Sequence, residues 1–248
     1  MTTPGERRLY VFFEAGRTRY AIEAVGVQEV ARPAAGDETL HGHLGLRDFS
    51  QLLGGAAEEG ASAALVLDTS PTLAVRVKSV DGVFDASGDR QLPLPRRMIP
   101  LAAPALRGGL VHEGRLFFEV DTDGVVRGLP KSTRQLERAT RTPAEPCLVF
   151  ESSTERFGVP LARVRQVVPA AGAFNPAPGT SAFLGAVVHQ QGLCPVFSVS
   201  ESRAPEAFIV IAEAGGELIG LSAQRADGVR PPASLDGVSV LDLERMFS

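Results

Sequence analysis

The feature that most constrains the fold of this chain is an internal repeat. Residues 11–30 align with residues 148–167 without a gap, and the apolar pattern is kept between the two stretches. Shorter blocks recur in the same order: Ala64–Leu67 matches Phe208–Ile211, Leu73–Val75 matches Ile219–Leu221, Asp81–Val83 matches Asp227–Val229, and Phe118–Val120 matches Leu241–Leu243. Chance alternation can imitate one block but not an ordered set. The repeat therefore predicts two copies of one β-rich unit.

Short strands account for most of the pattern within each copy. In the first copy, Leu9–Phe13 and Arg19–Ile22 form a predicted hairpin, and Val25–Val30 alternates as a strand does. Few helices are expected, and the candidates are Leu46–Leu53, Thr133–Ala139 and Leu243–Phe247. A further segment, Asp121–Gly124, is interpreted as a turn after the last strand of the first copy.

The repeat also predicts the domain boundaries. The first domain spans residues 9–127 and the second spans residues 146–248. Between them, residues 128–145 are rich in arginine and proline, which is typical of an exposed linker.

The two copies differ in where they are shortened. Residues 31–63 of the first copy correspond to the longer stretch 168–207, so its middle hairpin is expected to be short. Residues 84–113 correspond to only 230–236, so the late segment of the second copy is short. A trimmed β-barrel exposes strand edges, and we expect the copies to pack on each other or on a partner.

Composition excludes several classes of function. The chain has 25 Lys and Arg against 29 Asp and Glu, a net charge of −4, and lacks the basic footprint that nucleic-acid binding needs. Two cysteines are too few for a disulfide framework or a cysteine-based zinc site. No secretory signal is visible, and no apolar run approaches the about 20 residues of a membrane helix. A soluble, cytoplasmic protein without membrane insertion is expected.

The repeated unit resembles the CheW-like domain, the adaptor module of bacterial chemosensory arrays. The resemblance covers most of the chain and depends on the order of several short motifs in each copy. These motifs are Phe12–Ile22 with Val27–Val30, Val149–Val159 with Val164–Val167, Pro195–Val199, the two Asp-Gly-Val segments, and Val240–Glu244.

The resemblance implies a mainly β fold of two tandem domains, each built from two small five-stranded SH3-like barrels that are partly trimmed. It implies a scaffold without catalysis or cofactor, which bridges chemoreceptor signalling tips to the regulatory domain of a histidine kinase. The Val-x-Glu-Val strand lies among the partner-contacting surfaces of the family, so Val27 and Glu29 are candidate interface residues, with Val164 and Gln166 in the second copy. The alternative is that both valines simply face the core.

Two segments depart from the family pattern. Val188–Gly192 replaces the usual Asn-Leu-Arg-Gly turn, and Pro195–Val199 lacks the aspartate of the usual Pro-Val-x-Asp-Leu strand. These departures favour a divergent adaptor in a specialised array.

The remaining chemistry-bearing residues are few. His41 and His43 could share one face of a strand, but a metal site needs a further ligand, and exposed loop histidines are the alternative. Arg96 and Arg97 lie in a proline-rich basic stretch, Arg90–Arg107, which is interpreted either as a partner-binding segment or as a long loop.

Three hypotheses follow. The first is a coupling adaptor between chemoreceptors and a histidine kinase. The second is a duplicated β-barrel module that binds a ligand or protein outside chemotaxis. The third, an enzyme, would need a cluster of titratable groups, and the histidines form no recognisable triad or metal set.

Overall fold

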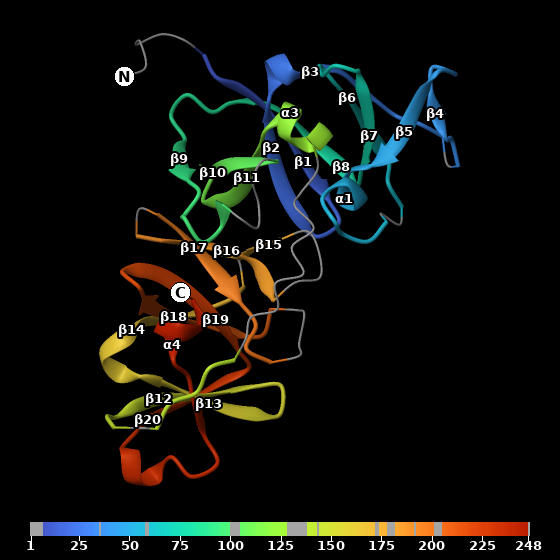
Figure 1. Ribbon diagram of the computed structural model, residues 1–248. Coiled ribbons are helices and arrows are strands. Elements are labelled where there is room, and N and C mark those ends of the chain that lie inside the picture. The colour runs from blue at the N-terminus through green and yellow to red at the C-terminus, as the bar shows by residue number, and fades with distance from the viewer. Residues whose placement is uncertain are drawn as a thin grey trace. The chain divides into compact units, whose positions relative to one another are not determined.

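The chain folds into two compact units in the computed structural model. Unit 1 comprises Met1–Lys131 with Asn175–Gly179, and unit 2 comprises Ser132–Phe174 with Thr180–Ser248. Figure 1 draws most of unit 1 in blue to green and most of unit 2 in yellow to red. The structure describes residues 7–34, 36–57, 60–99, 105–127, 138–142, 144–171, 174–177, 182–190, 192–200 and 205–247. The expected mainly β fold with few short helices is confirmed.

The first sheet of unit 1 has six strands in the order β8-β1-β2-β11-β10-β9. Its outer strands β8 and β9 are joined by a short turn, although they lie at opposite ends of the strand order. The strands are β1 (Leu9–Ala15), β2 (Thr18–Glu23), β8 (Ser79–Asp85), β9 (Arg90–Pro93), β10 (Leu106–His112) and β11 (Arg115–Val120), and helix α3 (Thr122–Arg127) follows β11.

The second sheet of unit 1 has five strands in the order β3-β6-β7-β5-β4. One apolar cluster contains Leu40, Val66 and Ala74, with Ala31, Leu44 and Leu46 packed against it, so every strand contributes to a single core and the sheet curls into a small barrel. The elements are the 3-10 turn η1 (Ala24–Gly26), β3 (Val27–Ala31), β4 (Thr39–Leu40), β5 (Leu44–Asp48), α1 (Phe49–Leu52), β6 (Ala63–Leu67) and β7 (Leu73–Val77).

Unit 2 also has two sheets, of four and six strands, in the orders β20-β12-β13-β21 and β14-β18-β19-β17-β16-β15. The four-stranded sheet is formed by β12 (Cys147–Ser152), β13 (Glu155–Pro160), β20 (Arg225–Arg230) and β21 (Ser239–Val240). The six-stranded sheet is formed by β14 (Val164–Pro169), β15 (Phe174–Pro176), β16 (Phe183–His189), β17 (Gly192–Phe197), β18 (Phe208–Ala214) and β19 (Glu217–Ala223). Of β15, only Phe174 is assigned to unit 2, because Asn175 and Pro176 belong to the segment assigned to unit 1. The short helical elements are η2 (Leu161–Arg163), η3 (Pro232–Ser234) and α4 (Leu243–Met246).

The strand registers agree between the two units over the longest aligned block. The β1–β8 pairing shifts between Phe12 and Phe13, and the β12–β20 pairing shifts at the aligned position, between Val149 and Phe150. The β3–β6 pairing skips Gln28, and the β14–β18 pairing likewise skips a single residue at the aligned position. Shared bulges are informative because each is a local irregularity that alternation alone does not require.

One predicted block match is wrong by two residues. Asp121 accepts a hydrogen bond from the Gly124 N–H (2.8 Å) at the start of α3, and Asp242 accepts one from the Arg245 N–H (3.2 Å) at the start of α4. Phe118–Val120 therefore corresponds to 239–241. A two-residue slip keeps every side chain on the same face of a strand, so the alternation could not reveal it.

A second block match is wrong by one residue. Glu29 pairs with Val66 and the aligned Gln166 pairs with Ile211, whereas the sequence matched Ile211 to Leu67. All five residues of β6 are buried. A strand buried on both faces has no alternation, and its register is therefore not encoded in its pattern.

The helix predictions had mixed outcomes. The helix predicted over Leu46–Leu53 is wrong in its first part, because residues up to Asp48 belong to strand β5. Only the short helix α1 follows, and the Asp48 side chain at its start accepts a hydrogen bond from the Gln51 N–H (3.0 Å). The segment interpreted as a turn, Asp121–Gly124, instead opens helix α3. The predicted terminal helix is present as α4, and most of Thr133–Ala139 lies outside the described residues.

The described end of the predicted linker belongs to a sheet of unit 2. Thr140 bridges Leu241, the Arg141 N–H donates to Val240 O (2.9 Å), and the Asp242 N–H donates to Ala139 O (2.8 Å). Ala139 is buried, whereas most of the other described residues of this segment are exposed: Arg138, Thr140, Arg141, Thr142 and Ala144. The segment lies beside β21 as β10 lies beside β11 in unit 1. There Asp121, which corresponds to Asp242, donates its N–H to Ala105 O in the same way as Asp242 donates to Ala139 O. No helix in the described ranges is long and apolar enough to cross a membrane.

Candidate docking surfaces

The first pair of predicted interface residues lies on β3, an outer strand of its sheet. Val27 is half-buried and Glu29 is exposed. The Glu29 carboxylate contacts His41 Nε2 at 2.9 Å, and His41 follows β4, the other outer strand of the same sheet. This contact, which is an ion pair when His41 is protonated, joins the two ends of the sheet, in agreement with the barrel that the shared apolar core indicates.

The second pair lies on β14, the equivalent outer strand of unit 2. Val164 is half-buried and Gln166 is exposed, so each residue matches the exposure of its counterpart on β3. Both strands carry a bulge next to these residues. A bulge twists an edge strand and interrupts its ladder, so binding through side chains is favoured here over addition of a partner strand.

A surface that the sequence reasoning missed lies beside β3 in unit 1. Val25 in η1 is 85% exposed, and a Cβ on the neighbouring Gly26 would come within 2.9 Å of the Thr122 methyl group on α3. Val126, one helical turn after Thr122, is 44% exposed. The Asp68 N–H donates to Gly26 O (2.9 Å), so Asp68 also lies next to Gly26. Asp123 follows Thr122 on α3 and is also exposed. We call Val25, Gly26, Asp68, Thr122, Asp123 and Val126 the unit 1 seam.

The corresponding place in unit 2 is held by ion pairs. Arg163, which aligns with Gly26, contacts Glu244 of α4 at 3.1 Å. Arg165, at the bulge of β14, pairs with Glu213 at the end of β18. The glycine in one copy against an arginine in the other was the sequence signal that could have identified this difference.

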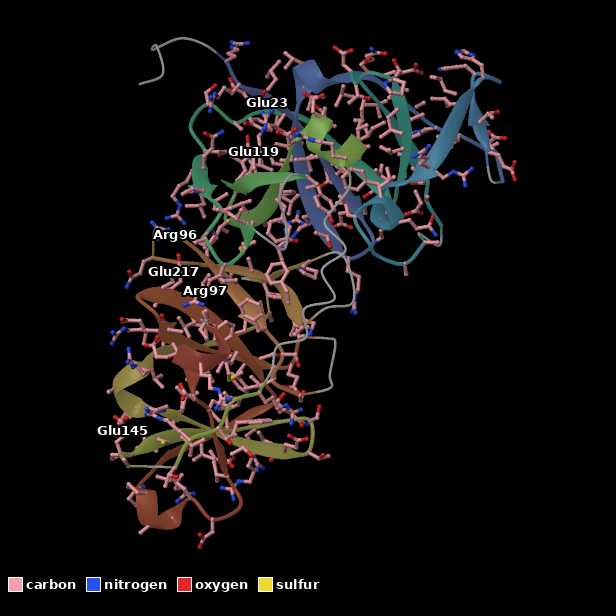
Figure 2. All side chains as sticks on the ribbon, in the orientation of Figure 1. Glu23, Arg96, Arg97, Glu119, Glu145 and Glu217 are labelled. Atoms are coloured by element: carbon pink, nitrogen blue, oxygen red, sulfur yellow. The ribbon has the colours of Figure 1, made fainter. Side chains whose placement is uncertain are left out.

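Arg96 and Arg97 lie in a turn-rich loop after β9. Arg96 is exposed and Arg97 is half-buried (Figure 2). Of the stretch Arg90–Arg107, both ends lie in strands, in β9 and at the start of β10, whereas residues 96–98 form a turn. Residues 100–104 lie outside the described residues. The structure therefore places these arginines apart from β3, on a different segment of unit 1.

The remaining titratable candidates take part in local contacts. His43 Nδ1 lies 2.9 Å from the His41 carbonyl, and the part of the chain that the structure describes contains no cluster of three or more His, Cys, Asp or Glu suited to a metal. Both cysteines are buried. Burial raises the thiol pKa of Cys147, and raises that of Cys194 to about 12, which leaves both thiols protonated near neutral pH.

A polar cluster in the first sheet of unit 1 was also missed. The Tyr10 hydroxyl lies 2.9 Å from Glu119 Oε1 and 3.4 Å from Glu23 Oε1, and it accepts a hydrogen bond from Gln91 Nε2 at 2.9 Å. Figure 2 labels the two glutamates, which lie near each other. Burial, and then the charge of Glu119, raise the pKa of Tyr10 above its usual value, so the phenol stays protonated. The cluster is made of groups that satisfy one another.

Comparisons with known proteins give limited similarity. No protein-family model matches the chain, and no curated protein matches it. Among solved structures, the chain is similar to the scaffolding protein TtCheW from Thermoanaerobacter tengcongensis, with 18% sequence identity and a TM-score of 0.36. The match covers 42% of this chain and 92% of that protein.

Proposed function

We propose that this chain is a non-catalytic adaptor built from two divergent CheW-like domains, which couples chemoreceptors to a histidine kinase in the cytoplasm. Under this proposal the domains are 9–127 and 146–248, joined by 128–145. The partners are the signalling tips of the receptors and the regulatory domain of the kinase. Binding alone performs the function, because holding the partners in a common geometry lets receptor state bias kinase activity.

The observation that carries this proposal is the repeated presentation of the family's interface strand. Val27 and Glu29 on β3 have the same exposure and neighbour the same bulge as Val164 and Gln166 on β14. Two docking strands on one chain raise the effective concentration of the second partner once the first is bound. Arg96 and Arg97 are proposed as a secondary contact, because Arg96 is exposed on a loop.

The test is an affinity capture from the native cell lysate, with bound proteins identified by mass spectrometry. Wild type is compared with Glu29→Lys, and His41→Gln serves as the matched control because it breaks the same ion pair without changing the charge of β3. We expect wild type and His41→Gln to recover a histidine kinase or chemoreceptors, and Glu29→Lys to recover less. Gln166→Lys makes the equivalent change in unit 2.

Two outcomes would revise the proposal. Undiminished recovery by Glu29→Lys would keep the adaptor but move its surface to β14 or to the Arg96 loop. Failure to recover any signalling protein, in a lysate that contains chemosensory arrays, would contradict the adaptor and favour a duplicated β-barrel interaction module outside chemotaxis.

A further inference from the structure

Two acidic positions that the units share are paired with arginines in unit 2 but not in unit 1. In unit 2, Glu213 and Glu244 flank the start of β14, and each is in contact with an arginine, Arg165 and Arg163 respectively. The structural alignment places Asp68 and Asp123 of unit 1 at these positions. Both aspartates are exposed.

Unit 1 lacks both of the arginines. Gln28 stands at the position of Arg165 and donates a hydrogen bond from Nε2 to Asp68 (2.8 Å), which leaves the negative charge in place. Gly26 stands at the position of Arg163 and has no side chain to reach Asp123. Within the described residues, no Lys or Arg forms an ion pair with either aspartate.

The same replacement leaves apolar surface exposed. Val25 and Val126 flank the point where Gly26 meets Thr122, and they are among the exposed large apolar side chains of unit 1. An exposed apolar patch bordered by polar or charged groups is typical of a protein interaction site. The unit 1 seam thus combines two valines with two unpaired carboxylates.

We infer that the unit 1 seam binds a protein segment that presents an apolar side chain flanked by two basic residues, which supply in trans the charges that Arg163 and Arg165 supply within unit 2. This inference rests on the proposed function, and it deepens it by assigning the working surface to unit 1. The ion pairs of unit 2 occupy the equivalent place there and leave no uncompensated charge for a partner. Charge complementarity of this kind sets partner choice and association rate.

The first experiment measures binding of a labelled synthetic peptide in which two arginines flank a leucine, against the same peptide with glutamates in place of the arginines. Fluorescence anisotropy with the full chain should show binding of the basic peptide only, weakened by added salt. Asp68→Lys with Asp123→Lys should weaken binding by about tenfold, because two exposed ion pairs with the arginines of the peptide are lost. The single variants Asp68→Lys and Asp123→Lys are measured as well, and Asp236→Lys is their control, because it makes the same charge change at an exposed turn of unit 2.

A second variant tests the argument without reversing a charge. Gln28→Arg places in unit 1 the residue that unit 2 carries at this position, and it should pair with Asp68 and reduce peptide binding. Equal binding by wild type, Gln28→Arg and the double lysine variant would overturn the inference, as would absence of binding by wild type. Loss of binding in Asp236→Lys comparable to that of the double variant would also overturn it.

The lysate capture separates this inference from the proposed function. Recovery of a kinase or chemoreceptors by wild type and equally by Asp68→Lys/Asp123→Lys would support the adaptor function and overturn the role of the seam. Peptide binding that responds to the seam variants, with no signalling protein captured, would support the seam and contradict the adaptor function.

Discussion

The first sheets of the two units place different chemistry at the same positions. In unit 1, Tyr10 faces Glu23 across the β1–β2 pair, and its hydroxyl meets Glu119 of β11. The corresponding residues of unit 2 are apolar: Cys147, Pro160 and Val240. Cys147 and Val240 belong to one core cluster. One backbone arrangement therefore supports either a polar or an apolar centre, according to what covers it.

The difference follows from the number of strands. Unit 1 has the hairpin β9–β10, and β9 brings Gln91 to the tyrosine hydroxyl. Unit 2 has only η3 and Leu235 in the equivalent stretch. A sheet with two fewer strands encloses less volume, and its core residues are smaller, as shown by three matched pairs: Phe12 and Val149, Phe117 and Val238, Ala21 and Gly158.

The largest expected effect is on core volume. Phe12→Ala should lower the free energy of unfolding of unit 1 by about 3–5 kcal/mol, because this fully buried ring packs against Phe84, His112 and Phe117. The matched change in unit 2, Val149→Ala, removes fewer atoms and should cost about 2 kcal/mol. Urea unfolding measures both.

Optical probes can separate the two units in this experiment. The chain has two tyrosines, both in unit 1, and no tryptophan, so tyrosine fluorescence reports unit 1 while circular dichroism reports the whole chain. Equal losses for the two variants would contradict the account in which the smaller sheet has the smaller core.

The next effect concerns the polar centre. Tyr10→Phe leaves the ring in place but removes the hydroxyl that joins Glu119 and Gln91, and should lower the free energy of unfolding by about 1–3 kcal/mol. Cys147→Ala is the comparison in unit 2, where no such network depends on the side chain. An unchanged urea midpoint for Tyr10→Phe would show that water replaces the network at no cost.

High pH should weaken the two units over different ranges. Burial raises the pKa of Cys194 to about 12 in unit 2, so the folded thiol stays protonated while the unfolded one ionises above about pH 9. Burial also raises the pKa of Tyr10 in unit 1, so unit 1 should begin to lose stability above about pH 10, where the unfolded phenol ionises. In each case the stabilisation is complete below the unfolded pKa and falls by about 1.4 kcal/mol for each pH unit above it, until the folded pKa is reached.

Urea unfolding at several pH values checks this order. Cys194→Ala should reduce the pH dependence of unit 2 only, and Tyr10→Phe that of unit 1 only. A part should remain in each unit, because burial also raises the pKa of Cys147 and of Tyr20. A pH dependence that neither variant alters would show that other groups control alkaline unfolding.

The smallest effect tests the segment that replaces a strand in unit 2. Arg141→Pro removes the N–H that donates to Val240 O, and should cost about 1 kcal/mol and speed hydrogen exchange at the Asp242 amide, which donates to Ala139 O. Arg141→Ala is the control, because it removes the ion pair with Glu145 but keeps the N–H. Identical exchange in the two variants would mean that the segment adds nothing to the sheet.

The sequence predicted the strands better than their registers. Alternation located β1, β2 and β3 and aligned them with β12, β13 and β14, and the shared bulges agree with that alignment. It misplaced β6 by one residue because the strand is buried on both faces. The end of β5, from Leu46 to Asp48, was predicted to begin a helix, because the few leucines of this short segment do not distinguish the two periods.

The candidate site shows the same division. Val27 and Glu29 were identified from a resemblance, and the exposure of Glu29 agrees with a surface role. The ion pair between Glu29 and His41 was not predictable, because it depends on the closure of a barrel that brings β4 to β3. Val126 was missed because its segment was interpreted as a turn rather than as helix α3.

The sequence by itself determined the strand content and the repeat of this protein, because alternation and block order are local or ordered along the chain. Tertiary structure alone decided which side chains meet. The contact of Gly26 with Thr122, the pairing of Arg163 with Glu244, and the linker segment beside β21 join residues far apart in the sequence. Such contacts depend on how sheets close and on which segment fills a vacant edge, and neither leaves a periodic signal in the residues.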